Sequence, residues 1–178
     1  DGDTPGLAAG AKEHKMGFRL SDTTEVVLEN VRVPRSAVIG EVGCGMSIAL
    51  NALNLSRAFI STLAVGIMQR ALDEAVAYAK QRKQFGRRLI DFEMVQAMLA
   101  DMAIKTEAAR VLVNNCMRQM DAGEMVRKDG AIVKTFVTDA MQEVVSNAVQ
   151  VLGGYGYSEE YPVEKLMRDA KIFQIFEG

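Results

Sequence analysis

The spacing of apolar residues changes near residue 40 and predicts two unlike regions in the chain. Residues 1–42 contain a strand-like run, 25–33, in which β-branched residues roughly alternate with polar ones before Pro34. One or two strands are not stable as an isolated sheet, so we expect this region to be the C-terminal part of a larger β domain. From residue 43 the apolar period is helical, which predicts a helical-bundle domain over 43–178 and a mainly α fold.

The helical region is expected to hold three long helices and one short one. The apolar stripes place them at about 46–81, 92–121, 125–152 and 163–169. Asp91 is the predicted N-cap of the second helix, and Gly123 and Gly153 are expected to end the second and third. Pro162 suits the first turn of the fourth. Because the connections are short, the long helices should pack antiparallel as an up-down bundle.

Composition narrows the possible functions. The net charge of −2 over 178 residues argues against a nucleic-acid-binding protein, and no apolar run looks long enough to span a bilayer. His14 is the only histidine, which excludes histidine-based catalysis, and no metal site is expected. Cys44 and Cys116 are far apart, which favours a reduced intracellular protein with Cys116 in the core; a single disulfide is the alternative.

Two segments carry candidate binding chemistry. Residues 81–88 (QRKQFGRR) read either as a cationic helix end closed by Gly86, which suits the helix dipole, or as arginines placed to hold a diphosphate. Residues 150–156 (QVLGGYG) read either as a helix C-cap and turn, or as backbone left open for a ligand by paired glycines. The second segment follows a helix, so it is not a dinucleotide-binding fingerprint.

Taken together and in order, these segments resemble the acyl-CoA dehydrogenase family over nearly the whole chain. The most specific are VLGG at 151–154 and YPVEKLMRDAKI at 161–172, supported by RKQFG at 82–86 and GIMQRALDEA at 66–75. Segments 3–6, 17–23 and 31–34 resemble the end of the family's β domain and the strand that leads into its helical domain. The resemblance also implies that the family's N-terminal helical domain, most of its β domain and its last helix lie outside this sequence. The chain alone is therefore expected to bind FAD poorly.

The resemblance implies FAD-dependent α,β-dehydrogenation of an acyl-CoA thioester to the trans-2-enoyl-CoA. Glu177 would remove the α proton as the catalytic base, and the β hydrogen would leave as hydride to the flavin. Some relatives place the base just before the arginine that matches Arg57, where this chain has Ser56. Glu177 is therefore the only carboxylate at either location. Acyl-CoA oxidase activity with oxygen is one alternative, and a non-catalytic helical oligomerisation module is another.

The resemblance also assigns binding positions and partners. Cofactor-binding positions are Arg82, Gln84 and Phe85, which match contacts to the FAD of a neighbouring subunit, and Gln150, Val151, Leu152, Gly153 and Gly154, which match contacts to its ADP half. Substrate-side positions are Asn54, Arg57 and Gly178, although relatives often have Asp where Asn54 stands. A shared site implies a homo-oligomer, either tetramer or dimer. The expected electron acceptor is an electron-transfer flavoprotein, in the bacterial cytoplasm or the mitochondrial matrix.

Overall fold

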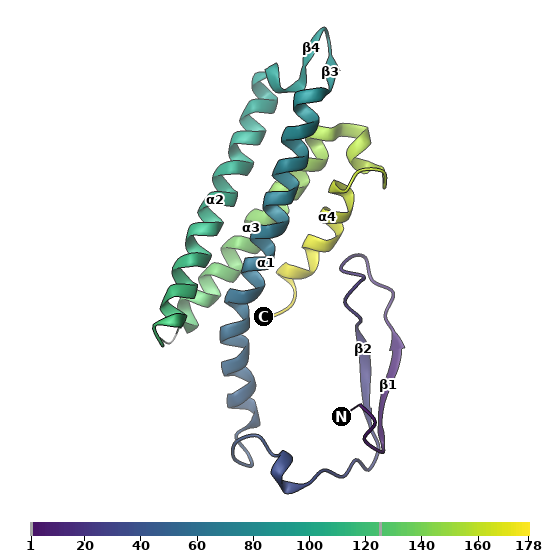
Figure 1. The fold of residues 1–178 in the computed structure, drawn as a ribbon, viewed down its shortest axis with the longest axis vertical. Helices are drawn as coiled ribbons and strands as arrows, with labels where there is room; N and C mark the ends of the chain where they lie inside the picture. Colours follow the sequence, from purple (N-terminus) through teal and green to yellow (C-terminus); the bar gives the residue numbers. More distant parts are fainter. Residues whose placement is uncertain (1, 125) are drawn as a thin grey trace.

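The computed structural model describes residues 2–124 and 126–178 as a bundle of three long helices with a β hairpin beside it (Figure 1). The helices are α1 (Gly45–Gln81), α2 (Glu93–Asp121), α3 (Arg127–Leu152) and α4 (Val163–Ala170). The strands are β1 (Leu7–Lys12), β2 (Thr24–Leu28), β3 (Lys83–Gln84) and β4 (Arg87–Arg88), and the 3-10 helices are η1 (Arg35–Ala37), η2 (Leu89–Asp91), η3 (Gly153–Tyr157) and η4 (Lys171–Gln174). The mainly helical fold and its up-down bundle are as predicted.

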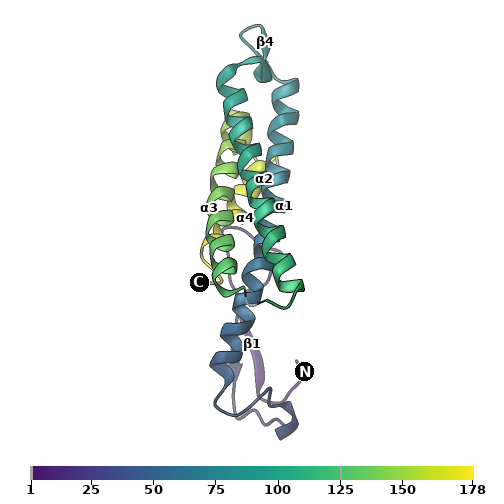
Figure 2. The same ribbon diagram turned by 90° about the vertical axis from the view of Figure 1, so that its left-hand side faces the viewer.

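The core lies between the three long helices, and α4 and η4 close one side of it. The interior face of α1 is lined by small residues, which let α2 and α3 approach closely: Ala58, Ser61, Ala64, Ala71, Ala75 and Ala79. In both views α1 extends past the ends of α2 and α3 (Figures 1 and 2). The apolar stripe predicted for its N-terminal half was wrong about burial, because Ile48, Leu53, Phe59 and Leu63 are exposed.

The helix ends agree with the prediction to within two residues, but one cap was wrong. Phe92, and not Asp91, is the N-cap of α2, and it makes no side-chain capping bond. The Asp91 carboxylate instead accepts hydrogen bonds from Nε and Nη2 of Arg88, at 3.1 and 2.9 Å. Met125, the predicted first residue of the third helix, lies outside the described residues; α3 begins at Arg127.

The segment between α1 and α2 also differs from the prediction. Gly86 does not close the helix, since α1 ends at Gln81 and Arg82 is already extended. The chain instead forms the β3–β4 hairpin, whose turn residues Phe85 and Gly86 have φ of 52° and 79°. Positive φ at both central residues is the geometry of a tight two-residue hairpin turn, which requires a glycine or a similarly tolerant residue.

The N-terminal hairpin was only partly predicted. Strand β2 ends at Leu28 and not at the expected Val33, because Asn30 adopts a φ of 53° and turns the chain. Its antiparallel partner β1 was not predicted. The β1 sequence LAAGAK lacks the β-branched residues that mark a strand.

Length and composition make α1 the only described helix that qualifies as a possible membrane span. The sequence prediction that the chain has no membrane span is not contradicted by this helix, which qualifies by length and composition only. The core helix of a soluble protein satisfies the same criterion, and α1 packs against both α2 and α3. Length and composition alone therefore do not identify α1 as a membrane-spanning helix.

Candidate functional site

The first candidate site forms where the C-terminal segment crosses α1. Ser56 and Arg57 are neighbours on α1, and both bind Glu177. The Ser56 hydroxyl donates a hydrogen bond to Oε2 of the Glu177 carboxylate, and Arg57 Nε donates to the Glu177 carbonyl oxygen at 2.9 Å. Arg57 also donates through Nη1 to Oδ1 of Asn54, at 3.3 Å. Two neighbouring residues of α1 therefore hold Glu177, Ser56 by the Glu177 side chain and Arg57 by the Glu177 main chain.

A buried lysine from α3 holds the same segment from the other side. Lys134 is only 4% exposed, and its ammonium group donates to the carbonyl oxygens of Gln174 and Gly178, at 3.4 and 3.3 Å. Sequence reasoning missed this residue. The sequence does contain a signal for it: Lys134 stands between Val133 and Val137, on the face of α3 that packs into the core. A lysine on such a face is rarely fully buried unless it has partners.

The backbone at this crossing has an uncommon conformation. Glu177 has a φ of 66°, and Gly178 has a φ of 80°. Left-handed backbone is uncommon for a residue with a side chain and is often found at functional sites. A Cβ on Gly178 would lie 3.2 Å from Nη2 of Arg57, so space as well as φ favours glycine. The Glu177 amide has no hydrogen-bond partner among the described residues and remains available as a donor.

The structure thus brings together Asn54, Arg57, Glu177 and Gly178, the positions predicted for the base and the substrate side. The close approach of α3 to α1 depends on Gly130, where a Cβ would lie 3.1 Å from the carbonyl oxygen of Asn54. A cavity of about 510 Å³ adjoins the segment just before Glu177; Ile172, Ile175 and Phe176 line it together with the β1–β2 loop and the cationic side chains of Lys15, Arg168 and Lys171. The arrangement presents a fixed carboxylate and an unpaired amide on one residue, which suits proton abstraction from a bound substrate.

The second candidate site is a cavity of about 670 Å³ at the far end of α1. It is lined by Tyr78, Arg82, Gln84, Leu89, Val151, Leu152, Gly153, Gly154, Tyr155, Ser158 and Glu160. Two segments far apart in sequence therefore meet here, and most of the predicted cofactor positions line the cavity. Gln150 and Phe85 do not line the cavity. Phe85 stands at the hairpin tip, 92% exposed, with its ring edge-on to Phe92.

The chemistry of this cavity suits a nucleotide diphosphate. The Arg82 guanidinium lies 5.4 Å from the centre of the Tyr155 ring and can pair with a phosphate. Burial raises the pKa of the Tyr78 hydroxyl, which therefore stays protonated as a donor. A Cβ on Gly154 would meet no protein atom within 4 Å, so packing within the chain does not require glycine there. The glycine instead leaves the wall open to a ligand.

The two sites are well separated within one chain. Arg57 lies on α1 and Arg82 directly follows the end of that helix, 25 positions later, which corresponds to roughly 37 Å along the helix axis. Figure 1 shows the β3–β4 hairpin at one end of the bundle and the C-terminus near the other. Among the described residues no group of three or more His, Cys, Asp or Glu side chains is placed to hold a metal ion.

The fold and these two sites define a helical-bundle domain that holds one carboxylate at a crossing on its longest helix and a phosphate-compatible cavity at the other end. Residues 43–178 match the family model for the C-terminal domain of acyl-CoA dehydrogenases. The chain therefore belongs to the acyl-CoA dehydrogenase family, whose members are in general FAD-dependent oxidoreductases.

Named relatives support this assignment. The chain is 48% identical to a probable acyl-CoA dehydrogenase of Mycobacterium tuberculosis over 177 residues, which are 99% of this chain and 46% of that protein. It is 42% identical over 173 residues to a caffeyl-CoA reductase–Etf complex subunit of Acetobacterium woodii, covering 97% and 46%. The solved butyryl-CoA dehydrogenase of Megasphaera elsdenii superposes with a TM-score of 0.97 at 46% identity, covering 99% and 46%. The chain spans about half the length of these relatives.

Proposed function

We propose that the protein to which this chain belongs dehydrogenates an acyl-CoA thioester between its α and β carbons, with Glu177 as the base that removes the α proton. The observation that carries the proposal is the separate anchoring of Glu177, with its carboxylate on Ser56 and its carbonyl on Arg57. A base fixed in this way is pre-aligned with a bound substrate, which lowers the entropic part of the barrier. The Asn54, Arg57 and Gly178 positions form the substrate side of the site.

The weakly acidic α C–H bond requires stabilisation of the charge that develops on the thioester oxygen. The unpaired Glu177 amide is the donor that this chain offers for that oxygen. Base and donor then belong to one residue, so the anchors that fix Glu177 place both groups together. FAD, when bound, supplies the acceptor for the β hydride.

The cavity between Arg82 and Gly154 is proposed to bind the diphosphate and adenosine part of FAD. Arg82 and Gln84 would contact phosphate oxygens, and the 151–154 backbone would lie against the nucleotide. Arg57, which binds Glu177, and Arg82, which lines this cavity, are roughly 37 Å apart along the axis of α1. One chain therefore supplies the base at one FAD and cavity residues at another, which supports a homo-oligomer, either tetramer or dimer.

The proposed electron acceptor is an electron-transfer flavoprotein. One relative is named as a subunit of a reductase–Etf complex, and a structure described as the electron-transferring flavoprotein of Acidaminococcus fermentans includes a chain that superposes with a TM-score of 0.97. Oxygen consumption with acyl-CoA as the only other substrate would favour the oxidase alternative. Bacterial relatives support a cytoplasmic enzyme.

The test is an anaerobic titration of the complete FAD-loaded protein with saturated acyl-CoA thioesters of graded chain length, followed by the absorbance of oxidised flavin. We expect one chain-length class to bleach the flavin. Glu177→Gln should abolish bleaching while keeping FAD bound, and Glu159→Gln, at an exposed position, should behave as the wild type. A flavin that stays oxidised with every thioester would overturn the proposal. Normal bleaching by Glu177→Gln would instead leave a non-catalytic role for this segment.

A further inference from the structure

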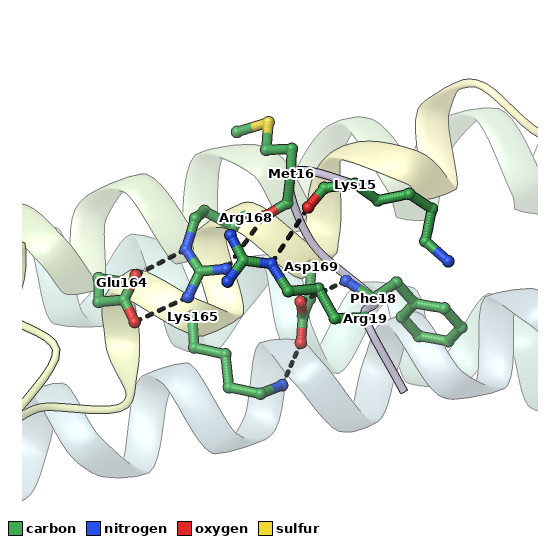
Figure 3. A network of polar contacts seen from close by, with 8 residues as sticks. All are labelled: Lys15, Met16, Phe18, Arg19, Glu164, Lys165, Arg168 and Asp169. Atoms are coloured by element: carbon green, nitrogen blue, oxygen red, sulfur yellow. Dashed lines mark hydrogen bonds and ion pairs between the residues drawn. The ribbon is translucent and has the colours of Figure 1, made fainter. Parts of the chain in front are cut away.

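The loop that follows β1 lies directly on α4, although the two are about 150 residues apart in sequence (Figure 3). The Phe18 amide donates a hydrogen bond to Oδ1 of Asp169 at 2.6 Å, and Arg168 Nη1 donates to the Met16 carbonyl oxygen at 3.0 Å. Gly17 sits between these bonds, and a Cβ there would lie 2.4 Å from the carbonyl carbon and oxygen of Arg168. The main chain of the loop therefore rests against the main chain of α4. We call this contact, made by residues 16–18 with Arg168 and Asp169, the loop–helix latch.

Asp169 is the central acceptor of the latch. Its side chain is buried, and besides the Phe18 amide it meets the ammonium group of Lys165 one turn earlier on α4 (Figure 3). Phe18 has a φ of 51°, which is uncommon for a residue with a side chain. A bond from its amide to an ionised carboxylate is among the stronger hydrogen bonds and favours this conformation. Arg168 is held in turn by both carboxylate oxygens of Glu164, at 2.7 and 2.9 Å.

The latch is connected to Glu177 by a row of three aromatic rings in edge-to-face contact. The Phe18 ring meets Phe173 edge-on at a centroid distance of 5.6 Å, and Phe173 meets Phe176 at 5.1 Å. Phe173 is completely buried, so it cannot move without displacing its neighbours. Phe176 directly precedes Glu177. Arg57 and Lys134 hold this segment through main-chain carbonyl oxygens at residues 174, 177 and 178, whereas the latch reaches it through the rings of Phe173 and Phe176.

We propose that Asp169, by holding the Phe18 amide, is a positioning residue that sets the place of the Glu177 carboxylate for proton abstraction. This inference rests on the proposed function. It assigns to the β-hairpin loop a role in the reaction although the loop does not touch the carboxylate. The bond needs only an oxygen acceptor on residue 169, whereas the contact with Lys165 needs a charge, so substitutions can separate the two.

The experiment compares Asp169→Ala with Asp169→Asn in the complete FAD-loaded protein. Two rates are measured: flavin bleaching by a substrate thioester, and exchange of the α proton with deuterated water in a thioester that has no β hydrogen. The second thioester can be deprotonated but not oxidised, so it reports on the base alone. Asp169→Ala should slow both rates by the same factor, about 10- to 100-fold, with unchanged affinity for the thioester. Asp169→Asn keeps an acceptor oxygen and should remain within about threefold of the wild type.

Controls separate positioning from folding. Lys165→Met removes only the ion pair of a half-exposed lysine and should leave both rates unchanged. Gly17→Ala should reproduce Asp169→Ala by pushing the loop off α4, whereas Gly66→Ala, where a Cβ meets nothing within 4 Å, should have no effect. If Asp169→Ala lowers only the melting temperature or the FAD content, and the rate per bound flavin stays at the wild-type value, the positioning role is refuted. If the wild type neither bleaches nor exchanges, the proposed function itself is wrong and this inference falls with it.

Discussion

Replacing Arg57 by Met tests whether the carbonyl anchor holds Glu177 in its working conformation. The left-handed backbone of Glu177 costs roughly 1–2 kcal/mol relative to an ordinary conformation. The bond from Arg57 Nε to the Glu177 carbonyl, at 2.9 Å, has a charged donor and is worth about 1.5–3 kcal/mol. The bond and the strain are of similar size, so without the guanidinium the strained conformation loses a contact large enough to offset its cost. A loss of about 2 kcal/mol reduces the population of that conformation roughly 30-fold.

The assay is single-turnover flavin bleaching by the complete protein, under anaerobic conditions and with saturating thioester. We expect Arg57→Met to bleach about 10- to 30-fold more slowly per bound flavin than the wild type. Arg70→Met is the matched control, because Arg70 lies on the same helix with a 61% exposed side chain paired to Glu74. That control should change the rate less than about twofold.

Two results would count against this reasoning. If Arg57→Met bleaches at the wild-type rate with FAD fully bound, the carbonyl contact does not determine the position of the base. If only the thioester concentration needed for half-maximal rate increases, Arg57 acts through substrate binding and not through Glu177.

Three further predictions concern the folded chain. Phe173→Ala should lower stability by about 3–5 kcal/mol and the melting temperature by about 10 °C, measured by thermal denaturation; a shift under about 2 °C would show that the ring is not a core residue. Hydrogen bonds from Arg168 hold the pKa of Glu164 below its usual range, so their stabilisation should disappear as the pH falls below about 4.3. Melting temperatures at pH 6 and pH 3 should therefore differ less in Glu164→Gln than in the wild type, and an equal difference would contradict this. Burial raises the pKa of the Cys116 thiol, so a thiol reagent should titrate one of the two cysteines until the chain is denatured.

The sequence predicted the helices well because their signals are local and repeat over many turns. The stripe of α3, from Val133 to Leu152, is buried at most of its positions, and Gly153 ends the helix with a φ of 61°. Burial on α1 was harder to predict. Its interior face is made of alanines, so the larger apolar residues that dominate the pattern lie outside the core.

The candidate sites were predicted as groups of residues but not as contacts. The resemblance named Arg57 and Glu177, yet only the folded chain shows that Arg57 binds the carbonyl of Glu177. Lys134 and Asp169 were not predicted as site residues because their partners lie 40 or more and about 150 positions away, beyond the range of any local pattern. The Asp91 prediction was wrong for a different, local reason: the two hydrogen bonds that Arg88 donates, from three residues earlier, outweighed the capping preference of the aspartate.

The hydrogen bond between Ser56 and Glu177 has an evolutionary consequence. Relatives are expected to place their base at one or the other of these two positions, and here the two side chains touch. The two arrangements are then alternative ways of filling one location, and an exchange between them requires no change of fold. The exchange is opposed by the sequences that would have to lie between the two arrangements. A lineage with carboxylates at both positions would bring two like charges into contact, and one with neither would lack a base. Serine at position 56 avoids this repulsion. It carries no charge, and its hydroxyl donates a hydrogen bond to the carboxylate at position 177.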